Sequence, residues 1–452
     1  MLKVKTKKRK LKKSVKFAIL LLIVIIVLLL CKPLLKKNET NNNNNNDINK
    51  TDTKEPDNKN NEEPIKKVDY NMVETSESDK EIIKQTFADG LSVEDYKKII
   101  DQEENYMKKS GEYTKINYNF ENKLHYSEIE EYIQQINNSS IAKVEIIGKS
   151  VDGRNIYGIE IGKGTNVLYI DANVHAAEVA NTLILTRFLS ELTNEYESGN
   201  EDIINKLNNV KIAVIPCMNP DGYEVYNYGI ESLNNKDLWI YQNKNNINFE
   251  NIKSNANGVD LNRNFPTQNA GMYYTTKDLI STVSLEKTTK NLKYFGGSSL
   301  GSEPETKAAM YFMFKHYKNT YAYLNMHSQG RVIYAGKPNL STEFNNLTAS
   351  FAKKISSYNN YTVYGLSAEE VGEGNDGSVT DFMAELANGF KYSTVTGRLS
   401  SDKYINPTCN FEYKYPVVTI ETITTYTRVP SYFKTEYYNK GLKEMLYSLL
   451  NN

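Results

Sequence analysis

The hydrophobic pattern from about residue 113 onward alternates short apolar runs with longer amphipathic stretches. One such stretch, residues 177–195, has helical spacing and places Ile184, Phe188 and Leu192 on one side. The short apolar runs are typical of strands buried on both faces. Strands that alternate with helices predict an α/β fold, with a mixed, largely parallel twisted sheet and helices on both faces. The clearest runs are NVLYI (166–170), KIAVIP (211–216), YAYLNM (321–326) and PVVTIET (416–422).

The N-terminus carries a different pattern, an unbroken apolar run next to a cluster of positive charge. Residues 1–16 hold nine Lys or Arg, and FAILLLIVIIVLLLC follows, extended by Leu34 and Leu35. This predicts a basic cytoplasmic tail (1–16) and a transmembrane signal anchor (17–35). The positive charge before the helix predicts a single-pass protein of the cell membrane, with a cytoplasmic N-terminus and the rest outside. A cleaved signal peptide is the alternative, but no small-x-small motif follows the run.

A polar stretch separates the membrane segment from the main body of the chain. Residues 36–69 are rich in Asn, Asp, Lys, Glu and Thr, which predicts a disordered linker. Residues 70–111 contain two short helical patterns, one opened by Ser78 and one by Ser92. We interpret them as a short helical stalk packed on the large domain (112–452). We prefer this to an inhibitory prosegment because no processing signal follows them.

Charge and cysteine content exclude several classes of protein. Beyond residue 37 the chain has 43 basic and 55 acidic residues, so the body is mildly acidic and no nucleic-acid partner is expected. Three cysteines are too few and too scattered for a disulfide framework or a thiolate metal cluster. A bound metal would therefore need other ligands, and the chain has only four histidines, His125, His175, His316 and His327.

Two of these histidines follow predicted strands. His175 and Glu178 lie in HAAE, just after the run 166–170, and His327 ends the run 321–326 in NMHSQG. Ligands bind beyond the carboxyl ends of the strands in such sheets. Each motif alone is also typical of an ordinary loop or a core histidine. Together, two imidazoles and one carboxylate suit one zinc ion with a fourth position left to water.

Two further motifs place charge where a binding site would need it. GVDLNRNFP sets Arg263 between two asparagines, a suitable fork for a carboxylate, although a solvated arginine in a surface turn would look the same. VVTIETIT places Glu421 inside an apolar run. A buried carboxylate costs several kcal/mol unless it is paired or near a metal, whereas a strand tip would leave it exposed.

These motifs, taken together, resemble the zinc carboxypeptidases of the carboxypeptidase A type. The resemblance covers about residue 113 to the C-terminus, and the motifs occur in the family's order. The GVDLNRNFP style of motif is similar to a bacterial branch that includes γ-D-glutamyl-diaminopimelate peptidases. The motifs are IGKSVDGRNIYGIEIG (147–162), HAAE, NPDGYE (219–224), GVDLNRNFP, SEPET (302–306), NMHS and TIET.

The resemblance implies a role for each candidate residue. Asn262 and Arg263 would hold the terminal carboxylate of a peptide substrate, and Glu421 would be the catalytic base for a zinc-activated water. The zinc ligands that it implies are His175, Glu178 and His327.

The sequence also departs from the family. The family places an arginine upstream of the N-R-N motif for the developing oxyanion, but none lies between Trp239 and Leu261. We expect Lys253 to substitute as a catalytic point charge. The segment EGNDGSVTDFM (373–383) resembles the loop with the family's mobile tyrosine but contains none, and we expect its Asp381 to support the fold.

The sequence therefore predicts a membrane-anchored, extracytoplasmic zinc metallocarboxypeptidase that acts as a monomer. It would hydrolyse a peptide bond at or near the C-terminus of a peptide, with a peptidoglycan stem peptide as one substrate class. A catalytically silent cell-wall-binding protein and a zinc deacylase of small amides remain alternatives.

Overall fold

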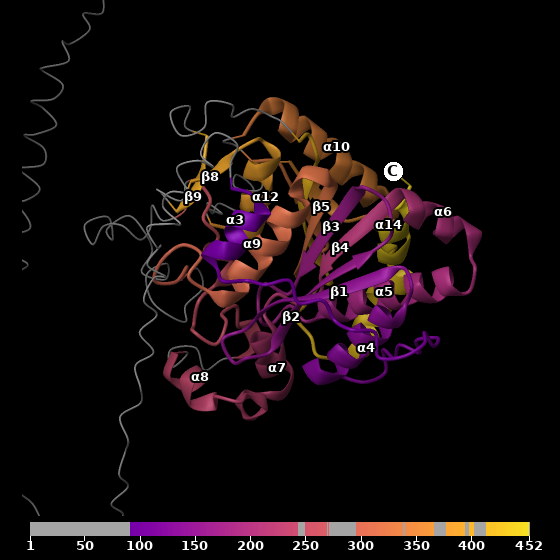
Figure 1. Ribbon diagram of the computed structural model, residues 1–452, viewed down its shortest axis with the longest axis horizontal. Coiled ribbons are helices and arrows are strands. Elements are labelled where there is room, and N and C mark those ends of the chain that lie inside the picture. Colours follow the sequence, from indigo (N-terminus) through magenta and orange to yellow (C-terminus); the bar gives the residue numbers. More distant parts are fainter. Residues whose placement is uncertain are drawn as a thin grey trace, which may run out of the picture. The chain divides into compact units, whose positions relative to one another are not determined.

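The structure of the protein is a computed structural model (Figure 1). It describes residues 91–242, 249–268, 270, 295–337, 340–365, 377–393, 397–401 and 413–451, all within the larger of two units, Asn71–Asn452. Among these residues, no helix combines the length and the apolar character that a membrane crossing requires. The predicted tail, signal anchor and linker, and the helical pattern after Ser78, lie outside the described residues.

The described strands form one large sheet and one small one. The large sheet has the order β1-β2-β4-β3-β5-β10-β6-β7, and its four central strands, β4, β3, β5 and β10, run parallel. Antiparallel pairing joins β1 to β2, β2 to β4 and β10 to β6. The predicted mixed, largely parallel sheet is therefore confirmed. The bounds are β1 Ala142–Lys149, β2 Asn155–Ile161, β3 Asn166–Ala172, β4 Val210–Ile215, β5 Thr320–Ser328, β6 Val332–Ala335, β7 Thr362–Tyr364, β8 Lys391–Ser393, β9 Arg398–Ser400 and β10 Val417–Thr422.

Helices cover both faces of the large sheet, as Figure 1 shows. Alternate side chains of the central strands enter two separate cores, because strand side chains point to opposite faces in turn. Leu168 and Ile170 belong to the core under α4, α5 and α14, whereas Tyr169 belongs to the core under α9 and α12. The α-helices are α3 Val93–Ile99, α4 Tyr126–Asn138, α5 Ala180–Glu197, α6 Glu201–Asn209, α7 Pro220–Tyr228, α8 Lys236–Gln242, α9 Pro304–His316, α10 Thr342–Asn359, α12 Val379–Ala387, α13 Pro430–Asn439 and α14 Leu442–Ser448. The 3-10 helices are η1 Ile230–Ser232, η2 Phe249–Asn251, η3 Leu261–Arg263 and η5 Tyr317–Asn319.

The segment just before residue 112 packs on this body. Ser92 caps α3 by accepting a hydrogen bond from Asp95 N, and the buried ring of Tyr96 lies 5.0 Å from Phe314 of α9. Further on, Met107 N donates to Val144 O of β1 at 2.8 Å, so this segment pairs alongside the edge strand of the sheet. Residues 91–107 therefore contribute to the same core and sheet as the residues that follow.

Candidate metal centre and peptide-binding site

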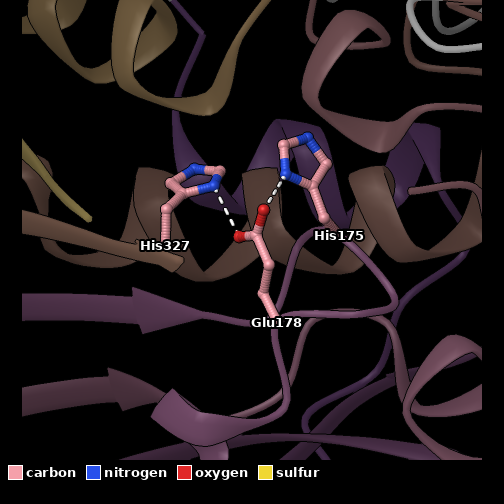
Figure 2. A group of neighbouring side chains, drawn as sticks. All are labelled: His175, Glu178 and His327. Carbon is pink, nitrogen blue, oxygen red and sulfur yellow. Dashed lines mark hydrogen bonds and ion pairs between the residues drawn. The ribbon is translucent and has the colours of Figure 1, made fainter. Parts of the chain in front are cut away.

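Three side chains meet at one end of the sheet, where two neighbouring parallel strands end. His175 and Glu178 lie in the turn between β3 and α5, and His327 is near the end of β5. Because Ala172 of β3 pairs with Met326 of β5, both strands end at the same level. Figure 2 shows the two rings on either side of the Glu178 carboxylate, with His175 Nδ1 to Oε1 at 2.7 Å and His327 Nδ1 to Oε2 at 2.8 Å.

This arrangement fits a divalent metal ion. One ligand atom from each of the three residues can be chosen so that all lie within 4.8 Å of one another, and all three side chains are buried. Burial raises the pKa of Glu178, but the two neighbouring imidazoles outweigh burial and hold the net pKa below its usual value. Two imidazole nitrogens and an ionised carboxylate are the donor set expected of a catalytic zinc site. The structure thus brings together the three ligands predicted from the sequence.

Polar residues behind the ligands fix their backbone. Asn181 Nδ2 donates to His327 O at 2.8 Å, and Thr422 Oγ1 lies 2.8 Å from Asn181 Oδ1. On the other ligand, Asn173 Nδ2 donates to His175 O at 3.1 Å. Strands β3, β5 and β10 and helix α5 therefore hold the metal centre jointly.

Asp260 joins the metal centre, although sequence reasoning did not identify it. Its Oδ1 lies 3.3 Å from His175 Nε2, an ion-pair contact on the ring nitrogen opposite the Nδ1 that faces Glu178. The same oxygen accepts a hydrogen bond from Asn262 N at 3.0 Å and so caps η3. Burial raises the pKa of Asp260, but His175 and Arg263 outweigh it, and the net pKa lies below its usual value. The sequence offered one signal for Asp260, its position two residues before Asn262 in GVDLNRNFP.

Asn262 and Arg263 lie on η3, a short and mostly buried helix. Asn262 Oδ1 accepts from Val379 N, at the start of α12, at 3.0 Å. Gly377 has a φ of 86°, and an added Cβ would lie 2.7 Å from Arg263 O. A glycine is therefore required where α12 approaches η3. The predicted carboxylate-binding pair is held in a rigid turn.

Glu421 reaches the site through the register of the sheet. It pairs with His327 across the parallel β10–β5 ladder, and its side chain is partly exposed. Its Oε2 atom is buried and has no hydrogen-bond partner among the described residues. Burial and the negative charge of Glu178 raise the pKa of Glu421 well above its usual value, whereas Lys253 lowers it. The site therefore holds a carboxyl oxygen that can bond to a water or a substrate.

Lys253 contributes positive charge to the same site. Its carbonyl oxygen accepts from Ala176 N at 3.4 Å, and the preceding carbonyl, of Ile252, accepts from Ala177 N at 2.9 Å. The segment thus runs directly beside the HAAE turn. Burial lowers the pKa of His327 below its usual value, although the negative charge of Glu178 raises it. The positive charge of Lys253 also lowers this pKa. Lys253 therefore lies in a segment beside the metal ligands, and its role as a cation for the oxyanion stays a prediction.

Tyr426 is a second residue that sequence reasoning did not identify. It lies beyond the end of β10, and its ring packs on the core under α5. Burial, followed by the charges of Glu178 and Glu421, raises its pKa, so the phenol stays protonated near the metal centre. Arg428, whose guanidinium lies over the Tyr226 ring at 4.0 Å, anchors this loop.

Comparison with known proteins agrees with this geometry. The sequence model described as zinc carboxypeptidase, peptidase family M14, matches residues 129–415. The chain belongs to the zinc carboxypeptidase family. Glu421 lies just beyond the matched residues, so its place in the site rests on the β10 register. The prediction of a zinc peptidase family is confirmed.

Curated relatives in this family include animal and bacterial proteins. The carboxypeptidase N catalytic chain of Rattus norvegicus is 34% identical over 145 residues, 30% of this chain and 29% of that protein. The γ-D-glutamyl-L-diamino acid endopeptidase 1 of Lysinibacillus sphaericus is 32% identical over 219 residues, 47% of this chain and 52% of that protein. The chain therefore spans less than a third of the first relative and about half of the second.

A solved structure shows the same zinc carboxypeptidase fold. Bovine thrombin-activatable fibrinolysis inhibitor, in complex with tick carboxypeptidase inhibitor, aligns with a TM-score of 0.51 at 18% identity. The alignment covers 73% of this chain and 98% of that chain. At this identity the comparison supports the fold alone.

Proposed function

We propose that this protein is a zinc peptidase that hydrolyses a peptide bond at or near the C-terminus of a peptide. The observation that carries the proposal is that Glu421, whose Oε2 has no partner among the described residues, pairs in register with His327 of the three-ligand group. The Asn262–Arg263 turn is tied to the same centre through Asp260. A metal ion, a base and a carboxylate fork are what a carboxypeptidase reaction requires.

The ligands would hold one zinc ion, which supplies a Lewis acid able to lower the pKa of water to about 7. Glu421 takes a proton from the water as its oxygen attacks the carbonyl carbon of the scissile bond. The same proton then passes from Glu421 to the leaving nitrogen as the carbon–nitrogen bond breaks. The products are a carboxylic acid and a free amine, and Glu421 returns to its ionised state.

Other residues of the site position and stabilise the reacting groups. Arg263, with Asn262, would hold the carboxylate of the peptide end by paired hydrogen bonds. Lys253 would stabilise the negative charge on the carbonyl oxygen as a point charge, without the fork of an arginine. The support for this assignment is the pair of backbone contacts that hold the Ile252–Lys253 segment beside the HAAE turn.

We further propose a peptidoglycan stem peptide as the substrate. The support is the relative from Lysinibacillus sphaericus, whose name states action on a γ-D-glutamyl-L-diamino acid bond. The signal anchor and linker expected at 17–35 and 36–69 would hold a monomeric domain outside the membrane, within reach of the wall.

A muropeptide digest tests the proposal. Purified protein is incubated with zinc and defined muropeptides or ordinary peptides, and the products are read by mass spectrometry, with Glu421→Gln as control. Cleavage before a terminal diamino acid by the wild type alone supports the proposal. Release of residues only from ordinary peptides would overturn the wall substrate. Absence of stoichiometric zinc would favour a silent wall-binding protein, and cleavage of small amides without a carboxylate would favour a deacylase.

A further inference from the structure

Two buried glutamates at the start of α9 bind the segment 253–263, which carries part of the site. Glu303 caps α9, and Glu305 lies in its first turn. Asn255 Nδ2, in the segment, donates to Glu303 Oε2 at 2.8 Å and to Glu305 Oε2 at 3.0 Å. Asn255 is itself fully buried. One amide group thus joins both glutamates to the segment.

Asn255 also closes the turn at the centre of this segment. Its Oδ1 accepts from Asn257 N at 3.0 Å and from Val259 N at 3.1 Å, and its own N donates to Val259 O at 2.9 Å. Lys253 precedes this turn, and Asp260, which caps η3, follows it. The position of Asn255 therefore helps to set where the lysine and η3 lie.

The surroundings of the two glutamates are rich in negative charge. Asp221 of α7 is also fully buried, and Arg154 Nη1 lies 2.9 Å from it and 2.5 Å from Asp152. The positive charge of Arg154 is thus shared between two aspartates. The same elements carry two lysines, of which Lys253 acts on the metal ligands and Lys307 of α9 is partly exposed.

Glu305 accepts from neutral donors in the described part of the chain. Val151 N donates to its Oε1 at 3.1 Å, and the Asn255 amide donates to its Oε2. Burial, followed by the charges of Asp221 and Glu303, raises the pKa of Glu305 to about 8. Two ionised carboxylates at one buried amide would repel each other, so the pair holds a proton at neutral pH.

We infer that Glu303 and Glu305 share one proton and are positioning residues, which hold Asn255 and through it the segment 253–263. The inference rests on the proposed peptidase function, to which this segment contributes its lysine and its arginine. With one proton, a carboxylate and a neutral carboxyl both accept from the Asn255 amide. Loss of the proton would place two buried negative charges there, and their repulsion would move a glutamate away and loosen the turn.

Urea unfolding of the zinc-loaded protein at several pH values tests the shared proton. Folding raises the pKa of Glu305, so the folded protein keeps a proton that the unfolded chain releases. This stabilisation is present at low pH and is lost as pH rises to about 8. Between about pH 5 and 8, the unfolding constant of the wild type should rise about tenfold or more relative to that of Glu305→Gln. A smaller relative rise would overturn the inference.

The matched control for this experiment is Glu343→Gln, which removes an exposed glutamate from the first turn of α10. Its unfolding should follow the wild type at every pH. If Glu305→Gln does not fold, Glu303→Gln replaces it, because removal of the neighbouring charge lowers the pKa of Glu305. The same relative rise and the same threshold then apply.

An exchange of donor and acceptor tests the positioning role. Asn255→Asp removes the donor and adds a charge, so kcat/KM per bound zinc should fall about tenfold or more. The second substitution Glu303→Gln supplies an amide in the reverse direction, and kcat/KM should rise about threefold or more above that of Asn255→Asp. No fall in the single variant, or no rise in the double variant, would overturn the inference.

If the wild type cleaves no peptide, the proposed function fails, and amide hydrogen exchange decides the inference. Exchange in a peptide covering residues 253–261 should be about tenfold faster in Asn255→Asp than in the wild type, because the turn opens more often. The double variant with Glu303→Gln should slow this exchange again. Equal rates in the wild type and Asn255→Asp would overturn the inference.

Discussion

Asp260 offers the sharpest test of how this metal centre is built. One of its oxygens contacts His175 Nε2 at 3.3 Å and caps η3 through Asn262 N at 3.0 Å. This contact would help to orient the His175 ring as a metal ligand. Loss of such a partner weakens metal binding about 10–100-fold, which is about 1.4–2.8 kcal/mol.

Two substitutions separate the contributions of Asp260. Asp260→Asn keeps an oxygen for both contacts and removes the charge, so zinc affinity should fall about tenfold with little change in KM. Asp260→Ala removes both contacts, so zinc affinity should fall about 100-fold. Loss of the η3 cap costs about 1 kcal/mol more, which should raise KM about fivefold because Asn262 and Arg263 move.

Zinc affinity is measured by competition with a fluorescent chelator, and KM is measured at saturating zinc. The control is Asp202→Asn, which removes an exposed carboxylate paired with Lys206 on α6 and should change neither value. Zinc binding by Asp260→Ala within about twofold of wild type would refute the reasoning, since it would show that the contact does not orient the ligand.

Three further predictions concern charge, metal and the N-terminal helix. Lys253→Met should lower kcat/KM about 100-fold. The acid limb of its pH profile should also move to higher pH, because Lys253 lowers the pKa of Glu421 and the base must be ionised. An acid limb that does not move would contradict this placement of Lys253. Zinc at 100 times its Kd should stabilise the fold by about 2.7 kcal/mol, seen as a drop in Tm on chelation, and an unchanged Tm would argue against a bound ion. Tyr96→Ala should destabilise the protein by about 3 kcal/mol in urea unfolding, compared with half-exposed Tyr432→Ala as control; an equal effect of the two would show that α3 does not pack in solution.

The central strands and the metal ligands were predictable because their signals are local. An apolar run of strand length followed by a polar residue marks the carboxyl end of a buried strand, and His175 and His327 both stand there. Asp260 and Tyr426 could not be found in this way. Asp260 reaches the metal centre only because η3 folds beside the HAAE turn, and Tyr426 because the loop after β10 turns back over the core. Likewise, Asp381 was expected to support the fold, but its partner Lys337 depends on how α12 docks on β6.

The site is coupled because single elements serve more than one part of it. Helix α12 contacts Asn262 through Val379 and Thr419 of β10 through Thr380, so one helical turn joins the Asn262–Arg263 pair to the strand that carries Glu421. Asp260 joins the same grip to His175. A cation on Glu178 would also cancel the charge that raises the pKa of Glu421, so metal binding favours the ionised base. Substitutions that remove every contact of such a residue, as Asp260→Ala does, should therefore change zinc affinity and KM together.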